Sequence, residues 1–457
     1  MAEDVRTVAV AGRTASIPSS VVTLAWPVMV ANFLQTLTLT VDLIMVGSLG
    51  ALAPTAVAAV GFGGQFIFLF FSIMIAVSSG TIALVARAVG AQNFDEADRV
   101  LKQSLVLGAL LSVPLLAVGF FLAEPMLAAF GPSPDVVGLG SAYIRVVSLS
   151  VFFQFLSFLG ASALRGAGDT VTPLAIGAGV NVVNFAANYV FIFGLGPIPR
   201  LEVVGAAIGT SLSFLLGALA YVAIFLRGRK KLRLTLHGPW TNRETIRRIF
   251  RIGWPAATEQ IALQGAFMIW VAMVVVFGTE VLAAHTIGMR IQMFAFMPGF
   301  GFAIAATALV GQNLGAKRPD AAERSGWDAA MWSVGVMGAI ALTIFAFAPA
   351  IARVFIADPE VIDFAVTFIR IHALSIPAVG VFFAIDGSLR GAGDTRFPLV
   401  TSLTGIYGLR LPLSYVLGFV LGFGIVGVWV PLVVEYWYRS AVISVYFRRG
   451  RWKKLRV

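Results

Sequence analysis

The chain contains almost the same decapeptide twice: LRGAGDTVTP at Leu164–Pro173 and LRGAGDTRFP at Leu389–Pro398. The two copies are related by a spacing of 389 − 164 = 225 in the numbering, and LRGAGDT is identical in both. Many combinations of glycine and aspartate suit a turn, so turn chemistry alone does not require this identity. The repeated decapeptide therefore indicates a duplicated structural unit.

The match extends beyond the decapeptide at the same spacing. ALVARAVGAQNFDEA at Ala83–Ala97 lies over ALVGQNLGAKRPDAA at Ala308–Ala322. Pro27 in LAWPVMV lies over Pro255 in RIGWPAA at a slightly larger spacing. The chain is therefore predicted to consist of two related halves, an organisation common in secondary transporters.

The composition is that of a polytopic membrane protein. Mean hydropathy is +0.91, and 12% of residues are charged, against roughly 25% in a soluble domain. About twelve apolar segments each reach the ~20 residues needed to cross a bilayer. The predicted fold is an all-α polytopic membrane protein with twelve transmembrane helices in two six-helix repeat lobes. The predicted spans are residues 20–46, 57–84, 101–122, 142–164, 173–194, 204–226, 253–276, 283–310, 328–350, 364–389, 397–420 and 425–446.

Basic residues set the predicted orientation. They concentrate in the central stretch LRGRKKLRLTLHGPWTNRETIRRIFR and in the C-terminal FRRGRWKKLR, which predicts that both termini are cytoplasmic. Residues 1–16 lack an apolar core, so we expect no cleavable signal peptide. The expected location is a prokaryotic inner (plasma) membrane. The predicted parts are the tail 1–19, the N-lobe 20–226, the basic linker 227–251, the C-lobe 252–447 and the tail 448–457.

Several classes of function are disfavoured by what the sequence lacks. There is no cysteine, and the three histidines do not have metal-ligand spacing. Neither a catalytic Ser–His arrangement nor a phosphate-binding Gly-rich motif is present. We therefore expect no enzyme activity, no cofactor and no nucleic-acid partner, since topology accounts for the net charge of +11. Membrane lipids are expected partners, with headgroup binding by the linker as a lesser role.

Asp42 is the clearest functional candidate, because it lies within an apolar segment. An ionisable group there costs about 2.5–3.5 kcal/mol on insertion scales. Asn32, Gln35, Leu39 and Asp42 follow 3-4-3 spacing along one helical face, and Pro27 precedes them as a kink position. The carboxyl group is suited to exchange a proton, or a proton for sodium. The alternative is an aspartate that reaches water near the outer helix end.

A second polar face lies in GVNVVNFAANYVFIFGLG. Asn181, Asn184 and Asn188 share one side of the predicted helix. Three amides are costly against lipid, so this side should turn inward, either as a functional face or as an interhelical hydrogen-bond zipper. Gln154 and Thr210 are weaker candidates of the same kind.

The second half lacks this amide pattern. At the repeat spacing, Asn184 and Asn188 fall on Leu409 and Leu413, so the halves are alike in structure and unequal in chemistry. Glu259 lies one turn after Pro255 and is either functional or a charge near the cytoplasmic helix start. In the same half, an i,i+4 ion pair is expected between Asp386 and Arg390.

Together, the ordered motifs resemble the MATE family, the multidrug and toxic compound extrusion transporters. The resemblance rests on the twelve spans, the six-plus-six repeat, Pro27 with Asp42, GAQNFDEA/GQNLGAKRPDAA and the doubled LRGAGDT, and it covers nearly the whole chain. It implies two six-helix lobes that face alternate sides of the membrane, and we expect the protein to be a monomer. It also implies export of organic cations and amphipathic compounds, driven by proton or sodium influx.

The resemblance also implies roles for individual residues. Asp42 falls on the family's first-helix acid and Gln35 on a cavity position, with Asn32 and Gln154 as further cavity candidates. The list of cation-coupling residues is Asp42, Asn184, Asn188, Thr210 and Glu259.

Two departures concern the coupling ion. Asn188 is an amide where some members have Asp, and the tenth-helix acid of another branch would fall near Gly380. Asp42 is therefore the predicted coupling group, with a proton favoured over sodium. The competing functions are a flippase for a lipid-linked saccharide of the same broad superfamily, and a membrane scaffold or receptor.

Overall fold

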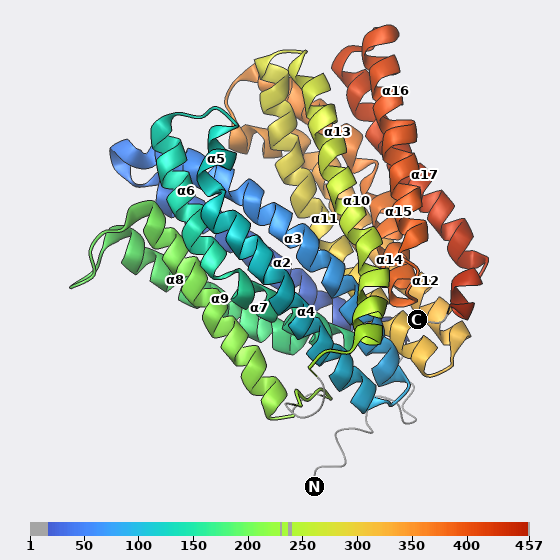
Figure 1. The fold of residues 1–457 in the computed structure, drawn as a ribbon. Coiled ribbons are helices and arrows are strands. Elements are labelled where there is room, and N and C mark those ends of the chain that lie inside the picture. Colours follow the sequence, from blue (N-terminus) through green and yellow to red (C-terminus); the bar gives the residue numbers. More distant parts are fainter. Residues whose placement is uncertain (1–16, 229–230, 236–239, 456–457) are drawn as a thin grey trace. The chain divides into compact units, whose positions relative to one another are not determined.

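The computed structural model of the protein describes residues 17–228, 231–235 and 240–455. Within these ranges the regular structure is helical and no strand is present (Figure 1). Most of the predicted N-terminal tail (residues 1–16), two pieces of the basic linker (229–230 and 236–239) and the last two residues lie outside the described part.

The helices of each predicted half follow one another in the same order. The first half contains α2 (Ile17–Gly47), η1 (Gly50–Leu52), α3 (Ala53–Gly90), α4 (Phe94–Phe121), α5 (Ala123–Ala128), α6 (Pro134–Leu149), α7 (Val151–Gly166), α8 (Val171–Phe193) and α9 (Glu202–Leu226). The second half contains α10 (Arg243–Val275), α11 (Thr279–Gly315), α12 (Pro319–Phe355), α13 (Pro359–Ala373), α14 (Ile376–Gly391), α15 (Arg396–Leu403), η2 (Thr404–Arg410), α16 (Leu411–Tyr415), η3 (Val416–Val420), α17 (Gly424–Arg448) and η4 (Arg451–Lys454).

The number and position of these helices agree with the twelve predicted spans. Within the described part of the chain, nine helices are long and apolar enough to cross a membrane. The count rises to eleven when each of two bent helix pairs is taken as one further span. The remaining predicted span corresponds to α17, whose 25 residues are enough for a crossing. Glu435 and Arg439 lower the hydropathy of α17, and both side chains are buried. The all-α polytopic prediction is confirmed.

Both repeats bend their fourth span at an equivalent serine, a feature that the sequence analysis missed. The angle is 53° between α6 and α7 and 45° between α13 and α14. In each bend a serine hydroxyl donates to the carbonyl three residues earlier at 2.7 Å, from Ser150 to Val147 and from Ser375 to His372. Serine side chains that bond the backbone in this way favour helix bending.

The repeated decapeptide forms the same turn in both halves. It closes α7 and α14, close to the ends of the predicted spans 142–164 and 364–389, and leads into the next helix. The N–H of each aspartate donates to the carbonyl of the leucine that begins the decapeptide, at 2.9 Å for Asp169 and 2.8 Å for Asp394. The preceding glycines, Gly168 and Gly393, both have φ of +84°. This is a Schellman helix end, in which glycine adopts the left-handed conformation without a side-chain clash.

The two repeats differ in the span that follows the turn. Whereas α8 is α-helical throughout, its counterpart from Arg396 to Val420 contains the π-helical segments η2 and η3. A π-helical turn accommodates an additional residue in a helix. Gly205 closes on Phe191, and Gly427 makes the equivalent contact with Leu417, at a spacing of 417 − 191 = 226. The spacing of 225 between equivalent residues of the two repeats therefore does not hold to the end of this span.

The chain divides into two compact units. The N-unit comprises Val30–Val89 and Asn93–Gly253; the C-unit comprises the residues up to Met29, Gly90–Gln92, and Trp254–Val457. The division falls inside α2, two residues after Pro27, and inside α10, just before Pro255. The first part of α2 thus belongs to the C-unit and the rest of α2 to the N-unit. For α10 the first part belongs to the N-unit and the rest to the C-unit.

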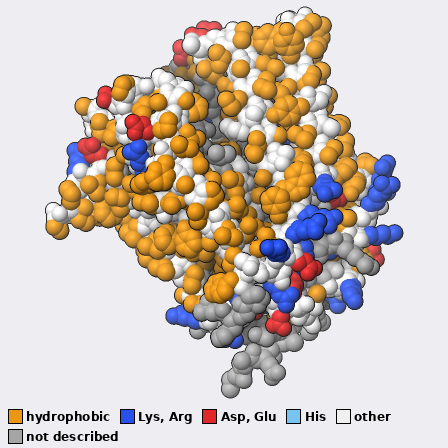
Figure 2. All heavy atoms as spheres, in the orientation of Figure 1, with side chains coloured by type: hydrophobic (Ala, Val, Ile, Leu, Met, Phe, Trp, Pro, Cys, Tyr) orange, Lys and Arg blue, Asp and Glu red, His pale blue; other side chains and the backbone are white. Residues whose placement is uncertain are grey.

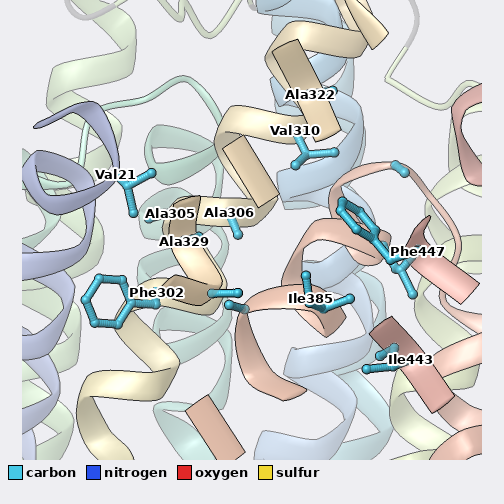
Figure 3. Packing of buried hydrophobic residues seen from close by; sticks show 14 of the residues in the cluster. Val21, Phe302, Ala305, Ala306, Val310, Ala322, Ala329, Ile385, Ile443 and Phe447 are labelled. Atoms are coloured by element: carbon cyan, nitrogen blue, oxygen red, sulfur yellow. The ribbon is translucent and has the colours of Figure 1, made fainter. Parts of the chain in front are cut away.

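Small residues allow close helix contacts inside each unit. In the C-unit core, Val21 and Phe302 lie near the alanines of α11 and α12 (Figure 3). Gly391 of α14 closes on the backbone of Thr307 in α11, and Gly166 of α7 closes on Ile82 in α3 at the equivalent place of the N-unit. Small side chains at such contacts let membrane helices approach closely.

The surface is apolar to a degree that suits lipid rather than water. In the face shown in Figure 2, hydrophobic side chains cover wide areas, and charged side chains occupy limited patches. Large apolar residues are strongly exposed, among them Phe121 at 72%, Leu342 at 74% and Val354 at 82%. Apolar exposure on this scale marks a surface that contacts something other than water. Together with the spanning helices, it is the surface of a multi-pass membrane protein.

Candidate functional site

A cavity inside the N-unit contains the predicted polar face of α2. Its volume is about 180 Å³, and its walls come from α2, α3, α7, α8 and α9. All four residues of the predicted 3-4-3 face, Asn32, Gln35, Leu39 and Asp42, line it. A neighbouring cavity of about 300 Å³ between α2 and α8 shares Asp42 with the first. The carboxyl group of Asp42 therefore lies at the wall of both cavities.

Asp42 is held by the amide stripe of α8. The Asn188 side-chain N–H donates to Asp42 Oδ1 at 2.7 Å and also approaches Asn184 Oδ1 at 3.2 Å. The Asn184 amide in turn donates to Thr210 Oγ1 of α9 at 3.3 Å. Asn184 and Asn188 are almost fully buried, and Asn181 lines the cavity one turn before Asn184. The amide stripe, formed by Asn181, Asn184 and Asn188, thus connects α8 with α2 and α9. It lies at the part of the cavity that contains Asp42.

A glycine on α9 makes room for this arrangement. A Cβ at Gly209 would collide with Asn188 Oδ1 and lie 2.8 Å from the Asn188 backbone nitrogen. The Oδ1 atom is buried and has no hydrogen-bond partner within the described part of the chain. An unpaired buried acceptor is costly unless another donor or a cation reaches it.

The cluster offers oxygen atoms suited to a proton or a small hard cation. They are the Asp42 carboxylate, the side-chain carbonyls of Asn184 and Asn188, and the Thr210 hydroxyl. Hard cations prefer such oxygen ligands. Among the described residues, no group of three or more His, Cys, Asp or Glu side chains could hold a metal ion. The arrangement can therefore neutralise one carboxylate reversibly, by a proton or by sodium.

Gln154 lines the same cavity from α7. Its side chain is 3% exposed, and its amide donates to Ser150 Oγ at 3.0 Å, beside the bend between α6 and α7. The wall between the polar groups is apolar, with Phe71 and Met74 from α3 and Phe158 from α7. Such a wall, with few convergent polar groups, is typical of a small-molecule site.

Glu259 belongs to a different cluster, in the C-unit. Its carboxylate accepts from Arg390 Nη2 at 2.6 Å and from the Ser402 hydroxyl, and lies 3.6 Å from Arg439 Nη2. Arg390 also pairs with Asp386 at 2.8 Å, which confirms the predicted i,i+4 pair. Glu259 is 3% exposed and does not line the Asp42 cavity.

Sequence reasoning missed two features of these sites. Arg165, which follows directly after the predicted span 142–164, lines the N-unit cavity. The ion pair between Glu435 and Arg439 (2.9 Å) extends the Glu259 cluster and was not singled out, although its i,i+4 spacing was visible.

Comparison with known proteins identifies one family, and relatives that match this chain over nearly their whole length. A family model described as MatE matches residues 27–190 and 255–416. "Probable multidrug resistance protein NorM" of Thermotoga maritima is 30% identical over 446 residues, covering 96% of this chain and 94% of that protein. "Uncharacterized transporter YisQ" of Bacillus subtilis is 28% identical, covering 95% and 94%.

Solved structures share the fold. A crystal structure of "MATE in the straight conformation" superposes with a TM-score of 0.88 at 24% identity, covering 95% of this chain and 96% of that one. The "outward-facing conformation of a multidrug resistance MATE family transporter of the MOP superfamily" gives a TM-score of 0.87 at 24% identity, covering 95% of both chains.

Proposed function

The chain belongs to the MatE family, and on this premise we propose that it is a secondary active antiporter. It exports cationic or amphipathic drugs and toxic organic compounds in exchange for protons or sodium ions. The multidrug-resistance names of full-length relatives support the substrate class. The observation that carries the proposal is the position of Asp42 at the wall of a largely apolar cavity within membrane-spanning helices.

The cavity chemistry supports a competition between substrate and ion. A deprotonated Asp42 gives the cavity a negative charge that attracts an organic cation, while aromatic and aliphatic walls bind its apolar body. A proton or sodium ion at Asp42 removes that attraction. Coupling then requires that the ion and the substrate stabilise different conformations.

The proposed cycle begins in the outward-facing state. A proton neutralises Asp42, which removes the desolvation cost of its charge and lets α2 bend at Pro27. The bend narrows the cavity and displaces the substrate outward. The unloaded protein then turns inward, and the proton leaves to the cytoplasm. Asn184, Asn188 and Thr210 position the carboxylate through the contacts described above.

A proton is the preferred coupling ion in this proposal. The cluster holds a single carboxylate with neutral amides and a hydroxyl, and one proton is enough to neutralise it. The buried Asn188 Oδ1, which has no partner among the described residues, supports sodium as the alternative. Glu259 is the second candidate for coupling, although two arginines and a serine engage its carboxylate.

The test is ethidium counter-transport in proteoliposomes, with pH and sodium gradients imposed separately. We expect the parent protein to respond to one gradient, the pH gradient first, and Asp42→Asn to lose that response. Asp135→Asn, which changes an exposed carboxylate at the start of α6, is the matched control and should keep it. If gradient-driven transport survives in Asp42→Asn, coupling lies elsewhere, and Glu259→Gln is the next variant.

A lipid-linked saccharide flippase is the second candidate function. Recognition of a pyrophosphate would favour several cations in the cavity. Among the described residues, Arg165 is the single Lys or Arg that lines the Asp42 cavity, which favours the exporter. Failure of drug movement under both gradients, together with movement of a labelled lipid, would favour the flippase.

The proposed location is the plasma membrane of a prokaryote, with both termini in the cytoplasm and a monomer as the working unit. The lobes 20–226 and 252–447 are the proposed moving parts. Because the chain contains no cysteine, a single cysteine placed in the C-terminal tail can report its side of the membrane through an impermeant maleimide. Labelling from the outside of intact cells would contradict the orientation.

A further inference from the structure

The two arginines of the repeated decapeptide occupy equivalent positions but differ in their charge balance. Arg165 and Arg390 are related by the repeat spacing, 390 − 165 = 225, and each lies in the last turn of its helix. Arg390 pairs with Glu259 at 2.6 Å and with Asp386 at 2.8 Å. Both carboxylates are more than nine-tenths buried. The cation of the C-unit turn is therefore neutralised by its neighbours.

The N-unit has no carboxylate at the corresponding positions. Asp386 corresponds to Ala161, since 386 − 225 = 161. Glu259 corresponds to Ala31, because the Trp-Pro pairs of α10 and α2 are related by 254 − 26 = 228, and 259 − 228 = 31. Both alanines line the Asp42 cavity, and so does Arg165. The region that holds two carboxylates in the C-unit is thus open space beside the arginine of the N-unit.

Arg165 keeps its charge uncompensated within the described part of the chain. Its side chain makes no hydrogen bond or ion pair with the described residues, and its buried Nε atom has no acceptor among them. Tyr221 of α9, which interacts with it electrostatically, is a neutral phenol at physiological pH. Asp169 belongs to its own turn, where it accepts from the N–H and the hydroxyl of Thr172 at 3.0 and 2.7 Å. Because a guanidinium stays protonated in proteins, this end of the cavity is positive.

Asp42 and Arg165 lie at different ends of the cavity. Asn188, which donates to Asp42, and Pro173, which lines the cavity close to the decapeptide turn, are 188 − 173 = 15 residues apart on α8. An α-helix rises about 1.5 Å per residue, so these positions are about 22 Å apart along the helix. The two charged side chains are therefore too far apart to neutralise each other. In the predicted orientation the turn that contains Arg165 is on the cytoplasmic side.

We propose that Arg165 is an electrostatic barrier that prevents protons and sodium ions from leaking through the N-unit. Without it, a cavity that water can enter would offer cations a route from Asp42 to the cytoplasmic end with no change of conformation. A fixed positive charge on such a route excludes cations, as arginines and helix dipoles do in selective pores. The inference rests on the proposed ion-coupled export and names a residue that keeps the ion flow coupled to transport.

The charge balance of the two repeats supports this role. Two unit charges about 4 Å apart near a protein surface repel each other by about three times the energy that corresponds to a tenfold change in population. An unpaired guanidinium therefore strongly depletes cations beside it. A carboxylate at Ala31 or Ala161 would remove this effect by pairing with Arg165. In the C-unit, where both carboxylates are present, the arginine contributes to a buried ion-pair network instead.

The test measures proton flux into proteoliposomes without any substrate, under an imposed membrane potential and with a pH-sensitive dye inside. The parent should conduct little more than protein-free vesicles. Arg165→Gln should raise the proton flux by about tenfold or more. Arg165→Lys keeps the positive charge and should stay near the parent. Arg227→Gln removes an exposed cation that follows α9 and does not line the cavity, so it is the matched control and should also stay near the parent.

A second variant keeps the arginine and neutralises it. Ala161→Asp places a carboxylate four residues before Arg165, as Asp386 lies before Arg390, and should raise the proton flux as Arg165→Gln does. Adding Asp42→Asn to Arg165→Gln should return the flux to the parent level, because the proposed route passes the Asp42 carboxylate. A flux that persists in this double variant would show that protons pass around the cavity, and the barrier would be refuted.

The remaining outcomes separate the barrier from a structural role and from the proposed function. An unchanged proton flux in both Arg165→Gln and Ala161→Asp overturns the inference, whether or not ethidium is exported. So does an equal rise in the release of trapped carboxyfluorescein, an anionic dye, because a misfolded protein leaks anions and cations alike; thermal unfolding identifies such a variant. A raised, Asp42-dependent proton flux in Arg165→Gln, together with a parent that couples ethidium to neither gradient, would support the barrier and count against the export function.

Discussion

The N-unit cavity and the C-unit charge cluster occupy corresponding places in the two repeats. Arg165, Ala161 and Gly177 line the cavity. The residues that follow them by the repeat spacing of 225, Arg390, Asp386 and Ser402, belong to the cluster. The two repeats share the order of their helices, the decapeptide turns and the close backbone contacts, whereas the side chains that face inward differ. One copy is open and carries little charge, and the other is filled and charged.

The comparison of the two repeats extends to α9 in the N-unit and its equivalent α17 in the C-unit. Gly205 and Gly427 make equivalent close contacts, at a spacing of 427 − 205 = 222. At this spacing Glu435 corresponds to Ser213, which lines the cavity. A hydroxyl on the cavity wall thus corresponds to a fully buried carboxylate in the cluster.

The cluster is balanced in charge. It contains three carboxylates and three guanidinium groups, connected in a chain of ion pairs. Its members are Glu259, Asp386, Glu435, Arg390, Arg410 and Arg439. Removing one partner from a buried network of this kind is strongly destabilising, because it leaves an uncompensated buried charge. The C-unit copy is therefore expected to be rigid, and the N-unit copy free to bind and release.

The strongest way to break the comparison is to remove the central cation of the cluster. Arg439 is 3% exposed, pairs with Glu435 at 2.9 Å, and lies over the Phe382 ring at 3.8 Å. Arg439→Met leaves buried carboxylates uncompensated, so the free energy of unfolding should fall by about 3–5 kcal/mol. Thermal or SDS-induced unfolding in detergent measures the change.

The matched control lies on the same helix. Arg448→Met removes an exposed cation from the last turn of α17 and should change the free energy of unfolding by less than about 0.5 kcal/mol. Equal effects of Arg439→Met and Arg448→Met would show that the buried network does not stabilise the C-unit, and the contrast between the two copies would lose its physical basis.

An intermediate effect is expected from filling space beside the amide stripe. Gly209→Ala introduces a methyl group that collides with Asn188, the residue that donates to Asp42. Overpacking of this kind costs about 1–3 kcal/mol, and displacement of Asn188 should also weaken gradient-driven transport. Gly64→Ala is the control, since a Cβ there meets no atom within 4 Å. Transport as strong in Gly209→Ala as in Gly64→Ala would contradict a positioning role for Asn188.

Much of the fold follows from the sequence because the decisive signals are local or repeated. Apolar segments of about 20 residues give the spans, and the decapeptide gives both helix ends through its glycine in the left-handed conformation. The 3-4-3 face of α2 was readable because helical spacing fixes which side chains share a side. The bends at Ser150 and Ser375 could not be predicted, because membrane helices that contain serine are usually straight.

The sequence does not predict which polar side chains on different helices bind one another. That Asn188 meets Asp42 depends on how α8 lies against α2, which no spacing within either helix specifies. Likewise, the contrast between Arg165 and Arg390 requires the neighbouring helices, because both arginines lie in identical heptapeptides. The sequence alone suggested that the repeats differ in chemistry, but not that a cavity in one corresponds to an ion-pair network in the other.

The smallest expected effect tests the part of the comparison in which the two copies agree. Gly168→Ala and Gly393→Ala each force a side chain into a φ of +84°, at a cost of about 1 kcal/mol. Because both turns make the same hydrogen bond to the first leucine of the decapeptide, the two variants should lower the free energy of unfolding by similar amounts, and the double variant by their sum. Thermal unfolding of the two single variants and the double variant measures this. A loss several times larger at one turn would mean that the turns, like the side chains around them, have diverged in what they support.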